Sequence, residues 1–253
     1  RLISEPGATL QLTNERTGKK FLVTLNKEGT FEPDTKLTGH GGDVFIVAVS
    51  DGVNNADYRE VLGRLAVPVN RQDGSGVDLK DPGLHKDELN ADGTPKFQRE
   101  RFTGPIFVRG VSCQDVIQGQ IADCFFPAAL SALGKTNPTV IKNMVKKNPD
   151  GTYTVTFKER SASGRITDVG VNIDADLYVR SWGGPLYGSS PNSDDPEKME
   201  LWFALIEKAY AAWIGSYNSI GNGGHPSVVF EDCTGQSAYS FDIPDYSTAE
   251  LWE

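Results

Sequence analysis

The sequence has little of what a nucleic-acid-binding or membrane-spanning protein needs. Basic residues are in deficit, because 25 Lys and Arg stand against 34 Asp and Glu, for a formal net charge of −9. This balance excludes a general binder of nucleic acids or anionic membranes, which needs a basic face, and it is compatible with cation binding. No apolar run approaches the roughly 18 residues that span a bilayer, and the opening lacks the basic-then-apolar pattern of a signal peptide. We therefore expect no membrane span.

Cysteine is also scarce. Three cysteines, Cys113, Cys124 and Cys233, are too few and too odd in number for a disulfide framework. A reduced compartment, or one functional thiol, is the simpler interpretation. The remaining composition, 38% hydrophobic and 23% charged over 253 residues, is that of a soluble globular protein with one large domain or two ordinary ones. Because the chain begins with Arg1, we expect it to be an excised or processed piece of something longer.

Residues 1–70 carry the pattern of an all-β module. Alternating or β-rich runs at 8–13, 21–25, 43–50 and 64–69 are separated by turns rich in Gly, Asn and Asp. Short strands at this spacing predict a small β-sandwich. The segment weakly resembles bacterial Ig-like modules, which implies a spacer or adhesion role and a secreted or cell-surface location.

Residues 71–100 are rich in Gly, Pro and Asp with little periodicity, which predicts a linker. Within it, residues 88–93 (ELNADG) carry the alternating oxygen ligands and the glycine of an EF-hand loop. The first position is Glu, and Arg99 stands where the bidentate Glu belongs. An Asx-rich turn is therefore favoured over a calcium loop.

The third segment, 101–253, mixes helix and strand patterns and predicts an α+β fold. Apolar residues at three- and four-residue steps make the helix predicted over 196–213 the clearest in the chain. The expected elements are helices over 123–135, 138–147 and 196–213, and strands over 152–157 and 170–173.

Cys124 falls at the predicted start of the first of these helices. The unpaired backbone N–H groups and the dipole at a helix N-terminus favour a thiolate. Gln118, six residues upstream, can point its amide at an oxyanion that forms beside the sulfur, as in papain-like thiol proteases. The alternative is that Cys124 is a small packed hydrophobic residue.

Three blocks of this segment resemble the calpain family of cysteine proteases. Residues 115–133 (DVIQGQIADCFFPAALSAL) are similar to its nucleophile segment, and 201–211 (LWFALIEKAYA) and 230–235 (FEDCTG) follow in family order. The resemblance covers about residues 105–240 and does not extend to 1–100. It implies a papain/calpain-like nucleophile lobe with a central helix that carries the cysteine.

This resemblance implies roles for particular residues. Cys124 would be the nucleophile and Gln118 the oxyanion donor. Calpain cores bind a regulatory Ca²⁺ in this lobe, and the matching positions here are the carbonyls of Val108 and Gly110 and the carboxylates of Asp115 and Glu200. Hard oxygen ligands of this kind suit Ca²⁺. For Asp115 alone, a loop-capping carboxylate is the alternative.

The sequence departs from the family pattern at three positions. Ala122 replaces a glycine, and its methyl group is expected to crowd the backbone beside the nucleophile. Phe125 replaces a tryptophan, so that an aromatic wall remains without the indole N–H, and Gln236 replaces the second glycine of the third block. Each departure is expected to reduce efficiency without removing the nucleophile.

A histidine base for the thiol is missing. In papain-type enzymes the His and Asn partners follow the cysteine by about 130–150 residues, whereas 253 − 124 = 129 residues follow Cys124 here. His225 precedes the third block, where the family has no catalytic His, and we expect it to be a loop residue. His40 and His85 are expected to have surface roles.

The leading hypothesis is therefore the Cys-bearing part of a calcium-dependent cysteine endopeptidase. It is expected to be inactive until a complementary His/Asn-bearing lobe and a protein or peptide substrate are added. One alternative is a non-catalytic calcium-binding or scaffolding module derived from such a lobe. A weaker alternative, motivated only by the Ig-like opening, is an adhesin-like surface fragment.

Overall fold

The structure of the chain is a computed structural model. The described residues are 9–14, 19–24, 44–49, 60–66, 69–70, 77–161, 164–181 and 183–239.

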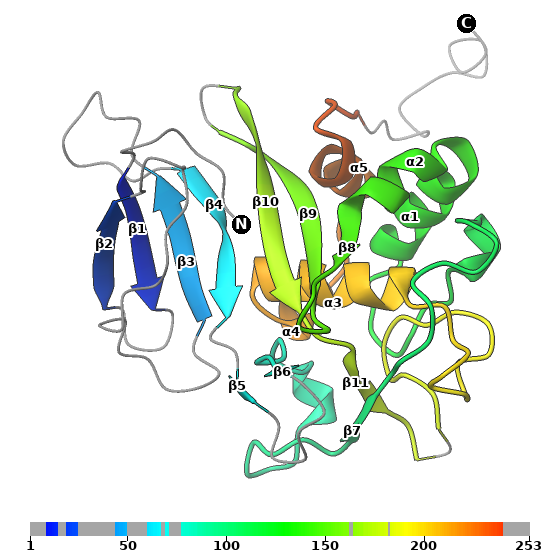
Figure 1. The fold of residues 1–253 in the computed structure, drawn as a ribbon. Helices are drawn as coiled ribbons and strands as arrows, with labels where there is room; N and C mark the ends of the chain where they lie inside the picture. The colour runs from blue at the N-terminus through cyan, green and yellow to red at the C-terminus, as the bar shows by residue number, and fades with distance from the viewer. Residues whose placement is uncertain are drawn as a thin grey trace, which may run out of the picture.

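Seven strands form one mixed sheet (Figure 1). Neighbouring strands are antiparallel except β4 and β10, which run parallel with Gly63 opposite Gly170. In order across the sheet the strands are β2 (Lys20–Thr24), β1 (Thr9–Asn14), β3 (Val44–Val49), β4 (Glu60–Ala66), β10 (Ile166–Ile173), β9 (Tyr153–Arg160) and β8 (Val145–Lys147).

The strands expected in the first 70 residues are present, and they lie in this same sheet. Strand β4 pairs with β10, so the sheet continues from the N-terminal segment into the part with the helices. A two-sheet sandwich would need further strands, and residues 25–43 and 51–59 lie outside the described part of the chain. The Ig-like module and the domain division at residue 70 stay predictions.

The helices collect around β8, β9 and β10 (Figure 1). Helix α3 (Trp202–Ile214) packs against these three strands, while α1 (Phe125–Thr136), α2 (Pro138–Met144) and α5 (Pro226–Thr234) pack on one another. Short α4 (Tyr217–Ile220) follows α3. Together they make the mixed α+β core that the sequence predicts. Among the described helices, none is both long and apolar enough to cross a bilayer.

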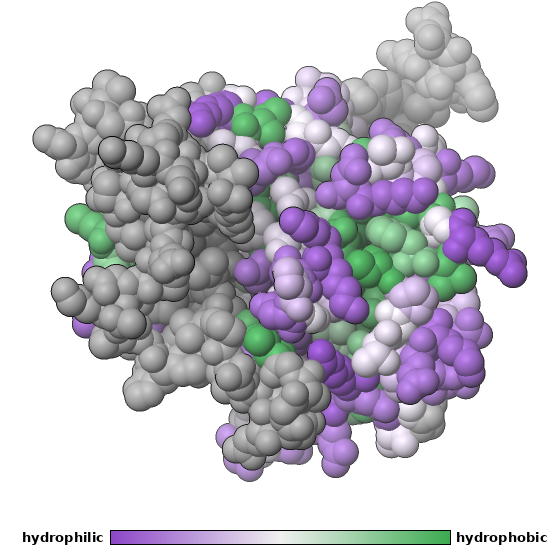
Figure 2. All heavy atoms as spheres, in the orientation of Figure 1, coloured by the Kyte–Doolittle hydropathy of each residue, from purple (hydrophilic) through white to green (hydrophobic). Residues whose placement is uncertain are grey.

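Aromatic rings join the helices to the sheet. Tyr210 of α3 stacks on Phe126 of α1, with ring centroids 4.6 Å apart, and meets Phe157 of β9 edge-on at 5.6 Å. Phe157 also stacks on Trp213 at 5.0 Å. Aromatic pairs at these separations add to the burial of apolar area, so α1 and α3 are fixed to the same part of the sheet. On the described surface facing the viewer, the largest apolar area lies on the side of the helices and is bordered by polar residues, and smaller apolar areas lie elsewhere (Figure 2).

Two of the expected helices are shorter in the structure. The helix expected over 196–213 begins at Trp202, because the amides of Leu201 and Trp202 bond the carbonyls of Pro105 and Ile106 at 3.0 and 3.1 Å. The helix expected over 138–147 ends at Met144, because the next three residues pair with β9 as β8. In both cases a tertiary backbone contact overrides the local pattern.

Helix α5 was not predicted from the sequence. Pro226 occupies its first turn, where a missing N–H costs nothing. Gly235 ends it in the left-handed region, with φ +73°, and donates its N–H to the Glu231 carbonyl at 2.7 Å. The Pro…Gly pair was the available signal for this helix.

The segment expected to be a linker, 71–100, is packed from residue 77 onward. Leu79, Leu84 and Glu88 are buried. Strand β7 (Gln98–Arg101) pairs with β11 (Asp176–Val179), and β6 (Val77–Asp78) pairs with β5 (Val69–Asn70). The linker prediction is therefore wrong for 77–100, and residues 71–76 lie outside the described part.

The EF-hand-like stretch within this segment is an Asx turn, as favoured from the sequence. Asp92 Oδ1 accepts hydrogen bonds from the N–H and the hydroxyl of Thr94, at 3.0 and 2.6 Å. Gly93 has φ +82°, a left-handed conformation that suits glycine. The carboxylate is used to close the turn.

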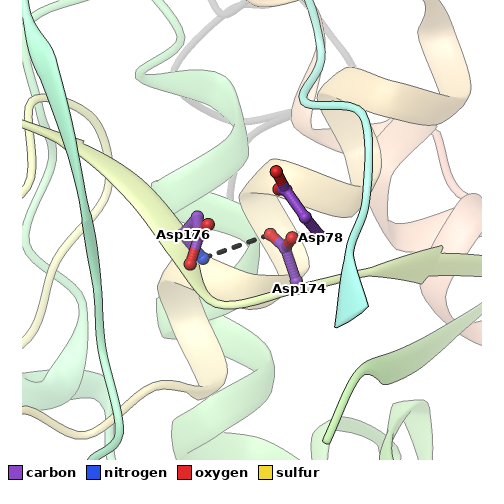
Figure 3. Close-up of side chains that lie close together, drawn as sticks. All are labelled: Asp78, Asp174 and Asp176. Carbon is purple, nitrogen blue, oxygen red and sulfur yellow. Dashed lines mark hydrogen bonds between the residues drawn. The ribbon is translucent and has the colours of Figure 1, made fainter. Parts of the chain in front are cut away.

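Three aspartates, from β6, the β10–β11 connection and the start of β11, converge beside α3 (Figure 3). Carboxylate oxygens of Asp78, Asp174 and Asp176 lie within 4.8 Å of one another. The ammonium of Lys208, only 2% exposed, lies 2.7 Å from Asp174 Oδ1 and donates to the Asp176 carbonyl at 2.7 Å.

A second cation completes the cluster. Lys208 also lies 2.5 Å from Asp81, whose other oxygen is 2.6 Å from Arg99. Because an ammonium and a guanidinium lie among these carboxylates and pair with Asp81, Asp174 and Asp78, we interpret the cluster as an ion network. It fastens residues 78–81 to helix α3.

We predict that Lys208→Met lowers the free energy of unfolding by about 3–5 kcal/mol, because it leaves buried carboxylates without their cation. Urea denaturation, fitted for midpoint and slope, measures the change. The matched control is Lys198→Met, which removes an exposed pair with Asp195 and should stay within about 0.5 kcal/mol. Equal effects of the two variants would contradict the network.

Candidate active site

Cys124 occupies the position immediately before helix α1, so the helix begins slightly later than the range 123–135 predicted from the sequence. Its backbone is already helical, and its carbonyl accepts the Ala128 N–H at 3.1 Å. The thiol is free and exposed. A sulfur at this end of a helix faces the positive end of the dipole, and a substrate can reach it.

The loop before Cys124 lies against residues 186–189. Ile117 and Ser189 exchange backbone hydrogen bonds, each 2.9 Å, and the Gln120 N–H reaches the Leu186 carbonyl at 3.1 Å. A Cβ at Gly119 would lie 2.4 Å from the backbone of Tyr187. Only glycine permits this approach, which explains the glycine that follows Gln118.

Gln118 is turned toward its own loop. Its Nε2 donates to the Ile121 carbonyl and to Asp123 Oδ1, both at 3.1 Å. These two bonds use both hydrogens of the amide. The structure therefore brings the predicted oxyanion donor to the residues that flank Cys124, with its N–H groups engaged there.

Residues 222–224 run beside the nucleophile loop. Ala122 and Asn222 form a parallel bridge, and the Gly223 N–H bonds the Ala122 carbonyl at 2.9 Å. A Cβ at Gly224 would lie 2.8 Å from the ring of Phe125. The Ala122 side chain is exposed, so the expected crowding by its methyl group does not occur. Phe125 is buried as an aromatic wall below Gly224.

Two histidines lie in the described part of the chain, and neither forms a hydrogen bond with the Cys124 thiol there. His225 is exposed at the start of α5. His85 accepts the Asp87 N–H at the start of a short 3-10 helix, η1 (Lys86–Glu88). His40 lies outside the described residues.

The predicted calcium ligands lie around one loop. The Val108 N–H donates to Glu200 Oε1 at 2.6 Å, and Gly110 shares the loop, with Arg109 and Gly110 at φ +59° and +101°. Asp115 ends the short 3-10 helix η2 (Cys113–Asp115) that follows the loop. The structure thus brings the four predicted positions into one neighbourhood.

The charge of Asp115 acts on Glu200. Burial, and the charge of Asp115, raise the pKa of Glu200 to about 7, against the opposing hydrogen bond from Val108. Asp115 Oδ2 accepts hydrogen bonds from the Ser112 N–H at 2.6 Å and the Trp202 Nε1–H at 3.3 Å. Asp115 therefore caps the loop, and its charge still acts on Glu200.

A second pair of carboxyl groups was missed by sequence reasoning. Asp123 and Glu207 are 0% and 1% exposed and bond each other below Cys124. The signal was present in the sequence, because Glu207 and Lys208 interrupt the apolar run of the clearest helix. Charged residues in the middle of a helix that is otherwise apolar on every side need internal partners.

An exposed cysteine at a helix start, with a glutamine six residues upstream, is the nucleophile arrangement of a papain-like cysteine protease. The model of the calpain family of cysteine proteases matches residues 94–253. The chain belongs to this family.

Curated relatives from plants and animals agree. The chain is 30% identical over 156 residues to the calpain-type cysteine protease DEK1 of Zea mays, and 34% identical over 140 residues to the calpain-1 catalytic subunit of Bos taurus. Calpain clp-1 of Caenorhabditis elegans is 32% identical over 143 residues. The matches cover 58%, 54% and 54% of this chain, but only 7%, 18% and 17% of the respective relatives.

We predict that Cys124 is the first thiol to be alkylated by a peptide-based electrophile. It is exposed, whereas burial raises the pKa of the Cys233 thiol far above its ordinary value and shields it. Mass spectrometry of digests should show Cys233 modified at least about 100-fold more slowly, since it reacts only after local opening. In Cys124→Ser the slower labelling of Cys113 should remain unchanged, and equal rates at all three thiols would contradict an activated nucleophile.

Proposed function

We propose that this chain supplies the nucleophile lobe of a calcium-dependent cysteine endopeptidase of the calpain type. The observation that carries the proposal is the exposed Cys124 thiol at the start of α1, with Gln118 in the loop that leads to it. The family match covers this segment. The substrate would be a protein or peptide, and the base would be a histidine of a complementary lobe.

In the proposed reaction the Cys124 thiolate attacks a peptide carbonyl. A sulfur–carbon bond forms, and the carbonyl oxygen becomes an oxyanion that the Gln118 amide and the Cys124 backbone N–H stabilise. The carbon–nitrogen bond then breaks, and the histidine returns to the leaving amine the proton that it took from the thiol. Water hydrolyses the acyl-enzyme in the second half. To donate to the oxyanion, Gln118 must give up at least one of its hydrogen bonds to Ile121 and Asp123.

The calcium ligands are proposed from the chemistry of the donor set. Asp115 and Glu200 bring two carboxylates to a loop that also offers the carbonyls of Val108 and Gly110, and hard oxygen donors of this kind suit Ca²⁺. Burial is the main cause of the raised pKa of Glu200 and the charge of Asp115 adds to it, and a bound cation would offset both effects. Bound there, Ca²⁺ would supply no chemistry to the peptide bond; it would hold the loop before the nucleophile against the start of α3.

A non-catalytic, calcium-responsive binding module is the second candidate. It is favoured by the engagement of both Gln118 N–H groups within the loop. In this candidate the amide stays bound to Ile121 and Asp123, and the lobe recognises a partner without cleaving it. Activity in the presence of a histidine-bearing lobe separates the two candidates.

We predict peptidase activity when this chain is combined with the His/Asn-bearing lobe of a calpain and Ca²⁺. Cleavage of a fluorogenic peptide is the measurement, and the chain by itself should give none. Cys124→Ala should abolish the activity, and Gln118→Ala should lower kcat about 10²–10³-fold, as expected for loss of an oxyanion donor. Association of the two lobes without cleavage would overturn the endopeptidase in favour of the binding module.

We predict that Ca²⁺ binds to the chain more tightly as pH rises toward 7. Because the pKa of Glu200 is raised to about 7, a proton occupies this carboxylate at lower pH, and Ca²⁺ must displace it. Calorimetric titration at pH 6 and pH 7.5 should show a lower Kd at the higher pH. Glu200→Gln should remove most of the binding, whereas Asp92→Asn, in the EF-hand-like turn, should not; the reverse result would place the calcium in that turn.

A further inference from the structure

Two carboxyl groups face each other below the nucleophile. Within the described part of the chain, Asp123 Oδ2 and Glu207 Oε1 are buried and accept no bond from an N–H or hydroxyl donor. A side-chain hydrogen bond joins the two carboxyl groups instead. Two carboxylates have only acceptors, so one of the pair must hold a proton.

The outer oxygens of the pair are committed to N–H donors. Glu207 Oε2 accepts the Gly188 N–H at 2.6 Å, and Asp123 Oδ1 accepts the Gln118 Nε2–H at 3.1 Å. The result is a chain of hydrogen bonds from Gly188 through Glu207 and Asp123 to Gln118. Its last member is the amide that the proposed reaction uses, and Asp123 directly precedes Cys124.

The groups around Glu207 do not supply a compensating charge. Tyr187 and Tyr217 are the titratable side chains that face it from the neighbouring loop and from α4, and burial raises the pKa of both, so they stay neutral. Burial and the charge of Asp123 raise the pKa of Glu207 well above its ordinary value, and burial raises that of Asp123 as well.

The neighbouring lysine is already engaged. Lys208 follows Glu207 on α3, and its ammonium lies against Asp81 and Asp174 in the ion network. A proton on Glu207 is therefore the simplest way to satisfy both buried carboxyl groups.

We propose that Glu207 is a positioning residue: it holds a proton in the interior, donates it to Asp123 and thereby aligns the Asp123 carboxylate to bind the Gln118 amide beside Cys124. The pairing itself is independent of the proposed function. Only the catalytic purpose of positioning Gln118 rests on the proposed function.

The directions of these bonds make the pair testable with amides. In Glu207→Gln the new amide donates to Asp123 and still accepts from Gly188, so the chain of bonds is kept without a shared proton. In Asp123→Asn the new amide accepts from Gln118 and donates to an ionised Glu207. In the double variant the two amide oxygens must still accept from Gly188 and Gln118, so the two NH₂ groups face each other without an acceptor.

The first test is a double-variant cycle on the unfolding equilibrium constant. Each single variant should raise the unfolding equilibrium constant less than about 10-fold. The increase in the double variant should be about 100-fold larger than the product of the two single increases, because two buried donors lose their acceptors. Additive effects would overturn the shared proton. A double variant that fails to fold is the extreme of the expected result, provided that both singles fold.

The second test follows the proton in the single variant. A folded chain that holds one proton more than the unfolded chain loses stability about 10-fold per pH unit as pH rises above the unfolded carboxyl pKa. Glu207→Gln should reduce the pH slope of the unfolding constant by this amount between about pH 6 and 8. The matched control Glu197→Gln, at an exposed glutamate, should leave the slope unchanged, and an unchanged slope in Glu207→Gln would overturn the proposal.

The third test reads the position of Gln118 directly. Its side-chain NH₂ signal in ¹⁵N spectra, assigned by its loss in Gln118→Leu, should persist in Glu207→Gln and shift in Glu207→Leu. An unshifted signal in Glu207→Leu would make Glu207 merely structural. None of the three tests needs peptidase activity, so a failure of the proposed function leaves them intact, and active enzyme with additive variants would reject the pair alone.

Discussion

Helix α3 is buried along almost its whole length, from Trp202 to Ala211, and it carries two adjacent ionisable groups into the interior. Burying a charge without a partner costs far more than a hydrogen bond returns, so the rest of the lobe must supply partners on both sides of the helix. On one side Lys208 forms ion pairs with Asp81 and with Asp174 of the β10–β11 connection. On the other side Glu207 takes Gly188 and Asp123. The helix therefore organises the lobe through its polar residues as well as its apolar ones.

This arrangement explains why distant segments meet at the nucleophile. The loop before Cys124 runs alongside residues 186–189, and Gly188 donates its N–H to Glu207. Any Cβ at Gly188 would lie 2.8 Å from the Glu207 carboxylate, so the contact requires glycine. The segment that begins at residue 77 is attached to the same helix through Lys208. The Lys208 network, the β7–β11 pairing and the buried side chains of Leu79 and Leu84 hold this segment in place, and no composition pattern of a linker would reveal these contacts.

Local signals predicted the parts that local chemistry decides. The helix start at Cys124, the Asx turn at Asp92 and the strands of the sheet all follow from spacing, capping and turn residues. Two of the misses depend on a partner far away in sequence: α3 starts late because Leu201 bonds Pro105, and residues 77–100 are packed through contacts that include Asp81 with Lys208. Spacing and the resemblance both indicated Gln118, but neither showed that Asp123 and Ile121 hold its amide.

If the proposed function holds, the bonds that hold Gln118 set the energy that the complete site must provide. A hydrogen bond to a neutral carbonyl is worth about 0.5–1.5 kcal/mol, and one to a charged group about 1.5–3 kcal/mol. Releasing the bond to Ile121 is thus the cheaper change, and it frees one hydrogen while the other stays on Asp123. An oxyanion at Cys124 is a charged acceptor and offsets that loss by itself. In the proposed reaction the loop would therefore remain in place, with Asp123 as the fixed end about which the Gln118 amide turns toward the sulfur.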